Sequence, residues 1–138
     1  EQSLEPWLPR VYGPEASDLL IVTFGNGVPM ALRAARELEQ DEGVAVRVLD
    51  LRWLKPLNAE AIAEHAAACR RVLVLDEGRP DGGIGEAVVT ALVERGVADR
   101  PIRRITGADC YIPLGDASRL VMPDEAVVVA AACELLER

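Results

Sequence analysis

Residues 71–85 of this chain read RVLVLDEGRPDGGIG. The apolar run at 71–75 predicts a buried strand, and apolar residues at helical spacing from Ile84 onward predict a helix. A strand that leads through a glycine-rich turn into a helix forms the edge of an α/β domain where ligands or partners usually bind. Asp76 and Glu77 would repel a phosphate there, and the G-x-G-x-x-G spacing of a dinucleotide site is absent. The sequence therefore does not predict a simple nucleotide-binding turn.

The alternation of strand and helix patterns continues along the whole chain. The apolar run at 18–24 predicts a strand buried on both faces of a parallel sheet, and Gly25-Asn26-Gly27 turns it into a helix. Valines 127–129 are poor helix formers, but their apolar run is too long for a typical strand, so we expect a helix. We expect strands at 10–12, 18–24, 44–49, 71–75 and 102–106, helices at 28–40, after Asn58, at 84–95 and from 123 to 136, and a loop at 107–122. This order predicts a three-layer α/β/α sandwich, with Leu20, Val22, Val46, Val48, Leu73 and Leu75 in its core.

Bulk composition limits the classes of protein to consider. At 138 residues the chain is long enough for one domain, which we place at 10–138 after a stiff, proline-containing lead-in at 1–9. No apolar stretch approaches the ~20 residues of a membrane span. The net charge of −8, without a basic stripe, argues against nucleic acid and anionic membranes as partners. Because the first residue is Glu1 and no signal segment follows, we expect an excised domain or a processed chain.

The residues best suited to nucleophilic or metal chemistry are few. Three cysteines, Cys69, Cys110 and Cys133, lie far apart without a C-x-x-C pair, so we interpret them as reduced, buried residues of a cytoplasmic protein. His65 is the single histidine, and it falls off the apolar stripe of its helix, so we expect it to face solvent. We therefore predict no catalytic residue and no metal ligand on this chain.

The two turns after the predicted strands at 18–24 and 71–75 hold the best functional candidates. Asp76 and Glu77 could act as acid or base, bind a cation, or pair with a partner's arginines; alternatively, one caps the next turn and the other is solvated. Asn26 can adopt left-handed geometry or cap the helix that follows it. We name Asn26, Gly27, Asp76, Glu77, Gly82 and Gly83 as candidate interface or switch-point residues.

Four blocks of the sequence resemble the transketolase C-terminal domain family, in the version found in the beta part of thiamine-diphosphate-dependent 2-oxoacid dehydrogenases. The blocks are DLLIVTFGNGV at 18–28, DLRWLKPL at 50–57, DEGRPDGGIG at 76–85 and RITGAD at 104–109 with Pro113. They occur in the family's order and cover roughly Arg10 to Leu136. Asn58 stands where the family commonly has Asp, and the loop at 112–117 departs from the commoner, shorter pattern with a second proline. Whether the parent is a separate beta subunit or an alpha–beta fusion stays open.

The resemblance implies a five-stranded, mostly parallel sheet in the order 1-3-2-4-5, with an antiparallel first strand at one edge. In that order the turns at 25–27 and 76–78 lie side by side at the switch point, where the connections reverse direction and a crevice is usual.

The resemblance also implies a function. In such oxidoreductases thiamine diphosphate and Mg²⁺ lie between two other domains, and the C-terminal domain serves assembly within a multienzyme complex. We therefore expect a non-catalytic interface domain that binds no cofactor itself, with the dehydrogenase's other domains or subunits and the acyltransferase core as partners, and a homo-oligomer. The alternative is a free-standing small-ligand or regulatory module that uses the switch-point crevice. The 2-oxo acid stays open, as pyruvate, branched-chain or other, because substrate selection lies outside this chain.

Overall fold

The computed structural model describes residues 7–137, so residues 1–6 of the predicted lead-in lie outside the described residues. The strands are β1 (Arg10–Tyr12), β2 (Leu19–Thr23), β3 (Val46–Asp50), β4 (Val72–Leu75) and β5 (Ile102–Ile105). The helices are α1 (Gly27–Glu42), α2 (Ala59–Ala67), α3 (Ile84–Glu94) and α4 (Glu125–Leu136), with a 3-10 helix, η1 (Gly115–Leu120), before α4. The sequence predicted every strand and α-helix, and it missed η1 inside the expected loop at 107–122.

All five strands form one mixed sheet in the order β1-β3-β2-β4-β5. β1 is antiparallel to β3, with Arg10 opposite Asp50, whereas β2, β3, β4 and β5 are mutually parallel. The fold class predicted from the sequence, and the strand order implied by the family resemblance, are therefore confirmed.

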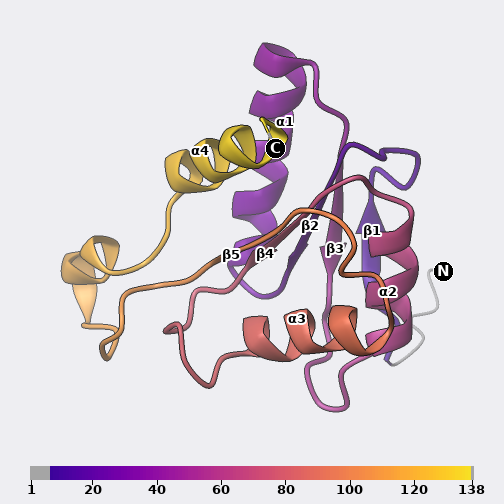
Figure 1. The fold of residues 1–138 in the computed structure, drawn as a ribbon. Coiled ribbons are helices and arrows are strands. Elements are labelled where there is room, and N and C mark those ends of the chain that lie inside the picture. The colour runs from indigo at the N-terminus through magenta and orange to yellow at the C-terminus, as the bar shows by residue number, and fades with distance from the viewer. Residues whose placement is uncertain (1–6, 138) are drawn as a thin grey trace, which may run out of the picture.

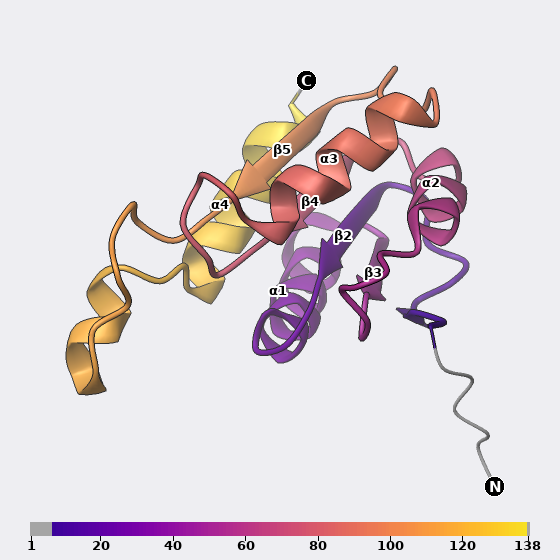
Figure 2. The same ribbon diagram turned by 90° about the horizontal axis from the view of Figure 1, so that it is seen from below.

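Helices cover both faces of the sheet, as Figures 1 and 2 show. α1 and α4 pack together on one face and α2 and α3 on the other. β2, at the centre, is buried along its whole length, which explains its lack of a polar–apolar alternation. The expected core residues are buried except Val46, which is half-buried because its part of β3 borders an open groove.

Local capping explains several helix boundaries. The Asn58 side chain accepts a hydrogen bond from the Ala61 amide at 3.0 Å, and Asp124 accepts one from the Val127 amide at 2.9 Å. Such caps satisfy amides at helix starts that have no partner within the helix. Within residues 7–137, no helix combines the length and apolar character needed to cross a membrane.

Candidate functional site

The carboxyl ends of β2 and β4 are joined by a buried side chain. The Thr23 hydroxyl donates a hydrogen bond of 2.9 Å to the Leu75 carbonyl. From this point the chain after β2 enters α1 on one face of the sheet, and the chain after β4 enters α3 on the other. The switch point therefore lies between β2 and β4, as expected from the strand order.

The start of α1 is packed against this junction too closely for any side chain. A Cβ atom on Gly27 would lie 2.0 Å from the Thr23 hydroxyl oxygen and 3.5 Å from a Leu75 methyl carbon. Gly27 thus serves close packing of helix on strand.

Asp76 is a structural residue at the end of β4. Only 3% of it is exposed, and its two carboxylate oxygens accept hydrogen bonds from the Gly78 amide at 2.8 Å and the Gly85 amide at 2.7 Å. Because Gly83, the residue before α3, has no side chain with which to cap the helix, Asp76 supplies a cap from nine residues before Gly85. Of the alternatives left open by the sequence, capping of the turn applies to Asp76.

The Glu77 carboxylate is the less constrained member of the pair. It is half-buried and, among residues 7–137, has no hydrogen-bonding partner. Burial, and secondarily the neighbouring Asp76, raise the pKa of this carboxyl. Both effects disfavour its charged form, so Glu77 takes up a proton more readily than an ordinary glutamate does.

Asn26 has neither of the roles predicted for it. Its backbone is right-handed, at φ −66° and ψ −22°, and its exposed side chain makes no capping hydrogen bond. Gly25 takes the left-handed position instead, with φ +57°, because a residue without Cβ reaches that region without strain.

The turn that contains Gly82 and Gly83 is held by two residues that sequence reasoning missed. Glu86, in the first turn of α3, accepts a hydrogen bond from the Gly82 amide at 2.8 Å. Arg104, on β5, donates one of 2.6 Å to the Pro80 carbonyl. A glutamate three residues after the capping position is a known helix-start pattern that could have indicated Glu86. Arg104 comes from a different strand and had no local pattern.

Two expectations about the chemistry-bearing residues were wrong. His65 is half-buried instead of facing solvent, and its Nδ1 lies 3.3 Å from a guanidinium nitrogen of Arg47 on β3. Cys110 is exposed, whereas Cys69 is buried as expected and Cys133 is half-buried. The helical pattern around His65 could not predict its burial, because Arg47, which covers it, lies on β3.

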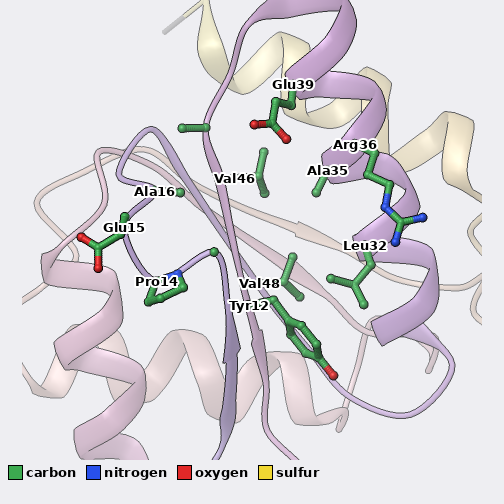
Figure 3. Close-up of a pocket in the computed structure, with 12 residues that line it drawn as sticks. Tyr12, Pro14, Glu15, Ala16, Leu32, Ala35, Arg36, Glu39, Val46 and Val48 are labelled. Carbon is green, nitrogen blue, oxygen red and sulfur yellow. The ribbon is translucent and has the colours of Figure 1, made fainter.

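Cavities lie beside the sheet edge as well as near the switch point. A groove of about 460 Å³ lies between α1 and the β1–β3 edge. Figure 3 shows the side chains that line it, among them Tyr12, Leu32 and Val48. A second hollow of about 420 Å³ lies next to the Gly82–Gly83 turn, where Arg79 stacks over Tyr111 at 5.5 Å. In the described part of the chain, no group of three or more His, Cys, Asp or Glu residues is placed to hold a metal ion.

Comparison with known proteins agrees with this architecture. The family model "Transketolase, C-terminal domain" matches residues 11–131. The pyruvate dehydrogenase E1 component subunit beta of Staphylococcus aureus strain Mu50 is 34% identical over 125 residues, which make up 89% of this chain and 38% of the relative. The mitochondrial subunit of the same name from Pisum sativum is 36% identical over 121 residues, or 86% of this chain and 33% of the relative.

Solved structures support the same assignment. A "split gene transketolase, inactive beta4 tetramer" has a TM-score of 0.83 and 31% identity, and the match covers 99% of this chain and 44% of that one. A 2-oxoglutarate:ferredoxin oxidoreductase from Magnetococcus marinus, at 19% identity and a TM-score of 0.65, shares the fold. This chain spans less than half the length of each of these relatives. The chain belongs to the transketolase C-terminal domain family.

Proposed function

We propose that this chain is the C-terminal assembly domain of the beta part of a thiamine-diphosphate-dependent 2-oxoacid dehydrogenase. The parent oxidatively decarboxylates a 2-oxo acid and transfers the acyl group to lipoyl, with the catalytic residues on other domains. The pyruvate dehydrogenase beta subunits that match most of this chain support the proposal.

One observation supports the non-catalytic assignment: the buried carboxylate at the switch point and amides beside the start of α3 are already bonded within this chain. Both Asp76 oxygens accept backbone amides, and the amides of Gly82 and Gly85 at the start of α3 are bonded to carboxylates. A diphosphate needs free amide donors at such a helix start, and its Mg²⁺ needs several oxygen ligands. The start of α3 therefore does not fit the diphosphate of thiamine diphosphate.

Exposed apolar side chains support a role in assembly. They lie mainly on the loops that follow β3 and β5 and include Trp53, Tyr111, Ile112, Leu114 and Leu120. Large exposed apolar groups of this kind mark interaction surfaces. The partners we propose are other domains or subunits of the parent dehydrogenase, the acyltransferase core and further copies of the chain, in the cytoplasm.

The alternative is a free-standing small-ligand or regulatory module. The hollow beside Arg79 and Tyr111 favours it, because that hollow adjoins the switch-point turn. A pyrimidine-binding domain encoded immediately upstream in the same reading frame decides for the assembly domain. An independent gene that encodes this domain alone decides for the module.

Calorimetric titration with thiamine diphosphate and Mg²⁺ tests the proposal. We expect no saturable heat in the micromolar range and no decarboxylation of pyruvate or branched-chain 2-oxo acids by the chain alone. Micromolar cofactor binding, or measurable turnover, contradicts the assembly-domain assignment.

A further inference from the structure

The turn between β1 and β2, at residues 13–16, is fastened to the sheet by a side chain of β3. Arg47 is 8% exposed, and its guanidinium donates hydrogen bonds to the Pro14 carbonyl and, at 3.0 Å, to the Ala16 carbonyl. The backbone of the turn contributes a hydrogen bond of its own, from the Ala16 amide to the Gly13 carbonyl at 3.0 Å. Arg47 therefore joins the turn to the inner strands of the sheet.

The third nitrogen of this guanidinium faces a histidine on α2. Nη1 of Arg47 lies 3.3 Å from Nδ1 of His65, which is half-buried. Because arginine keeps its proton, the contact is a hydrogen bond only while Nδ1 is unprotonated and accepts. A protonated imidazole brings a donor and a second positive charge to the same place, so the contact then becomes repulsive.

The charges around His65 act on it unequally. Burial, and secondarily Arg47, lower the pKa of His65, whereas Glu64 on the same helix raises it. Other charged groups on the neighbouring elements are exposed or already have partners: Glu15, Asp18, Glu60, Glu86, Glu94 and Arg100. β2, which also packs on α2, has no charged side chain. Arg47 is therefore the charge that protonation of His65 opposes.

The fastened turn also forms one wall of the groove beside α1. Figure 3 shows Pro14, Glu15 and Ala16 of the turn across from Leu32 and Arg36 of α1. A movement of the turn therefore changes the shape of this groove of about 460 Å³.

We propose that Arg47 and His65 form a proton-sensitive clasp on the turn between β1 and β2. While His65 is neutral, the clasp is closed and the turn is held against β3. When His65 takes up a proton, the imidazolium turns away from Arg47 toward water, water competes for the guanidinium, and the turn opens together with the edge strand β1. This device needs no cofactor and no parent enzyme, so it goes beyond the assembly role proposed above.

The direction of the pH effect follows from the linkage between the two states. The closed clasp holds the pKa of His65 below its ordinary value of 6.5, which the open turn restores. Opening is therefore independent of pH above 6.5 and increases as pH falls from there through the lowered pKa.

Two measurements on the 138-residue chain, between about pH 7.5 and 5, test the clasp. Nuclear magnetic resonance gives the midpoint of the His65 titration without assignment, because the chain has a single histidine. Hydrogen exchange with mass spectrometry, corrected for the intrinsic exchange rate, gives the protection of residues 10–17. We expect this protection to fall roughly tenfold for each pH unit between the His65 midpoint and 6.5.

Two variants separate the clasp from a merely structural contact. In His65→Asn, the side-chain amide oxygen can accept from Arg47 but takes up no proton in this range, so the turn should stay protected at every pH. Glu64→Gln removes the charge that raises the pKa of His65. The His65 midpoint and the loss of protection should therefore move together to lower pH.

The first turn of α4, at 124–128, is the internal control, because its local opening leaves the clasp intact. An imidazole that stays neutral down to about pH 5 overturns the inference, and so does a turn whose protection is constant while His65 titrates. The same conclusion applies if His65→Asn loses protection as the wild type does, or if the first turn of α4 loses as much as residues 10–17.

Discussion

Arg47 is a buried cation whose partners on the protein are neutral. It is 8% exposed and donates hydrogen bonds to the carbonyls of Pro14 (Nη2) and Ala16 (Nε, 3.0 Å). Its remaining nitrogen faces the Nδ1 atom of His65. Because arginine stays protonated, Nδ1 must act as the acceptor, which assigns a neutral imidazole with its proton on Nε2. Burial and then Arg47 lower the pKa of His65, whereas Glu64 opposes the shift.

This arrangement makes stability depend on pH through one side chain. The folded-state pKa of His65 lies below its ordinary value of 6.5. The stability that neutral His65 contributes to the folded protein is therefore complete above pH 6.5. It is lost as pH falls from there through the lowered pKa, because the unfolded chain binds the proton more readily. We expect His65→Asn to flatten the dependence of unfolding free energy on pH between 7.5 and about 5.5. Urea denaturation across this range is the measurement, and parallel wild-type and variant curves would show that His65 is not responsible.

Asp76 and Glu77 are neighbours with opposite structural importance, which gives a matched pair of substitutions. Asp76→Ala leaves the Gly78 and Gly85 amides without their acceptor, and we expect a loss of about 3 kcal/mol in unfolding free energy. Glu77→Ala should cost less than about 1 kcal/mol, as is usual for sites without a specific contact. Urea denaturation of both variants checks this, and equal losses would contradict the capping role of Asp76.

At the level of helices and strands, the junction of β2, α1 and β4 leaves no spare volume. Gly27 begins α1 against Thr23, and Thr23 is bonded to the Leu75 carbonyl. The helix can therefore start where it does only while its first residue lacks a side chain. The Thr23 hydroxyl therefore affects both the position of α1 and the contact between β2 and β4.

Gly27→Ala should destabilise the protein by about 2 kcal/mol, as overpacking does in a filled core. Thr23→Ala removes the obstructing hydroxyl as well as its hydrogen bond, so the double variant should lose less stability than the sum of the single losses. Unfolding free energies of the four proteins in this cycle provide the measurement. Additive losses would mean that the two residues do not compete for the same space.

The elements were predictable to the extent that they carry local patterns. β2 and β4 were found because strands covered on both faces are continuous apolar runs. The predicted start of β3 at residue 44 was two residues early, because the Ala45 amide bonds to the Asp18 side chain instead of entering the strand. η1 was missed because none of its residues is buried, so its sequence has no apolar periodicity to detect.

The molecule as a whole is organised around β2, with separate apolar clusters on the two faces of the sheet. Leu19 and Ile21 belong to the cluster under α1 and α4, and Leu20 and Val22 to the cluster under α2 and α3. Alternate residues of β2 thus pack against both helical layers. We therefore expect the hydrogen bonds of β2 to break only when the whole domain unfolds.

Hydrogen exchange followed by mass spectrometry checks this expectation. Amides of β2 and β4 should exchange slowest, at the rate set by global unfolding, and the exposed loop at 111–120 should exchange much faster. Fast exchange in β2 would contradict the shared-core description.

The switch point was predictable only in its location. Strand order brings the turns after β2 and β4 together, but the role of each residue there depends on contacts from elsewhere in the chain. Asp76 accepts a hydrogen bond from the Gly85 amide, nine residues later, and Arg104 on β5 helps to hold the turn at Gly82 through the Pro80 carbonyl. Sequence periodicity carries no information on such pairings, so Asn26 was given roles that it does not have.

The uneven surroundings of the three cysteines give the molecule a natural attachment point for a spectroscopic probe. Burial raises the pKa of the Cys69 thiol, and burial together with Glu42 and Glu137 raises that of Cys133. Both are therefore poor nucleophiles near neutral pH, because the thiolate is the reacting form. Cys110 is exposed and lies with Tyr111 in the lining of the hollow of about 420 Å³. A thiol-reactive fluorophore or spin label should therefore attach first at Cys110, and report motion of the loop that follows β5 without any engineered cysteine.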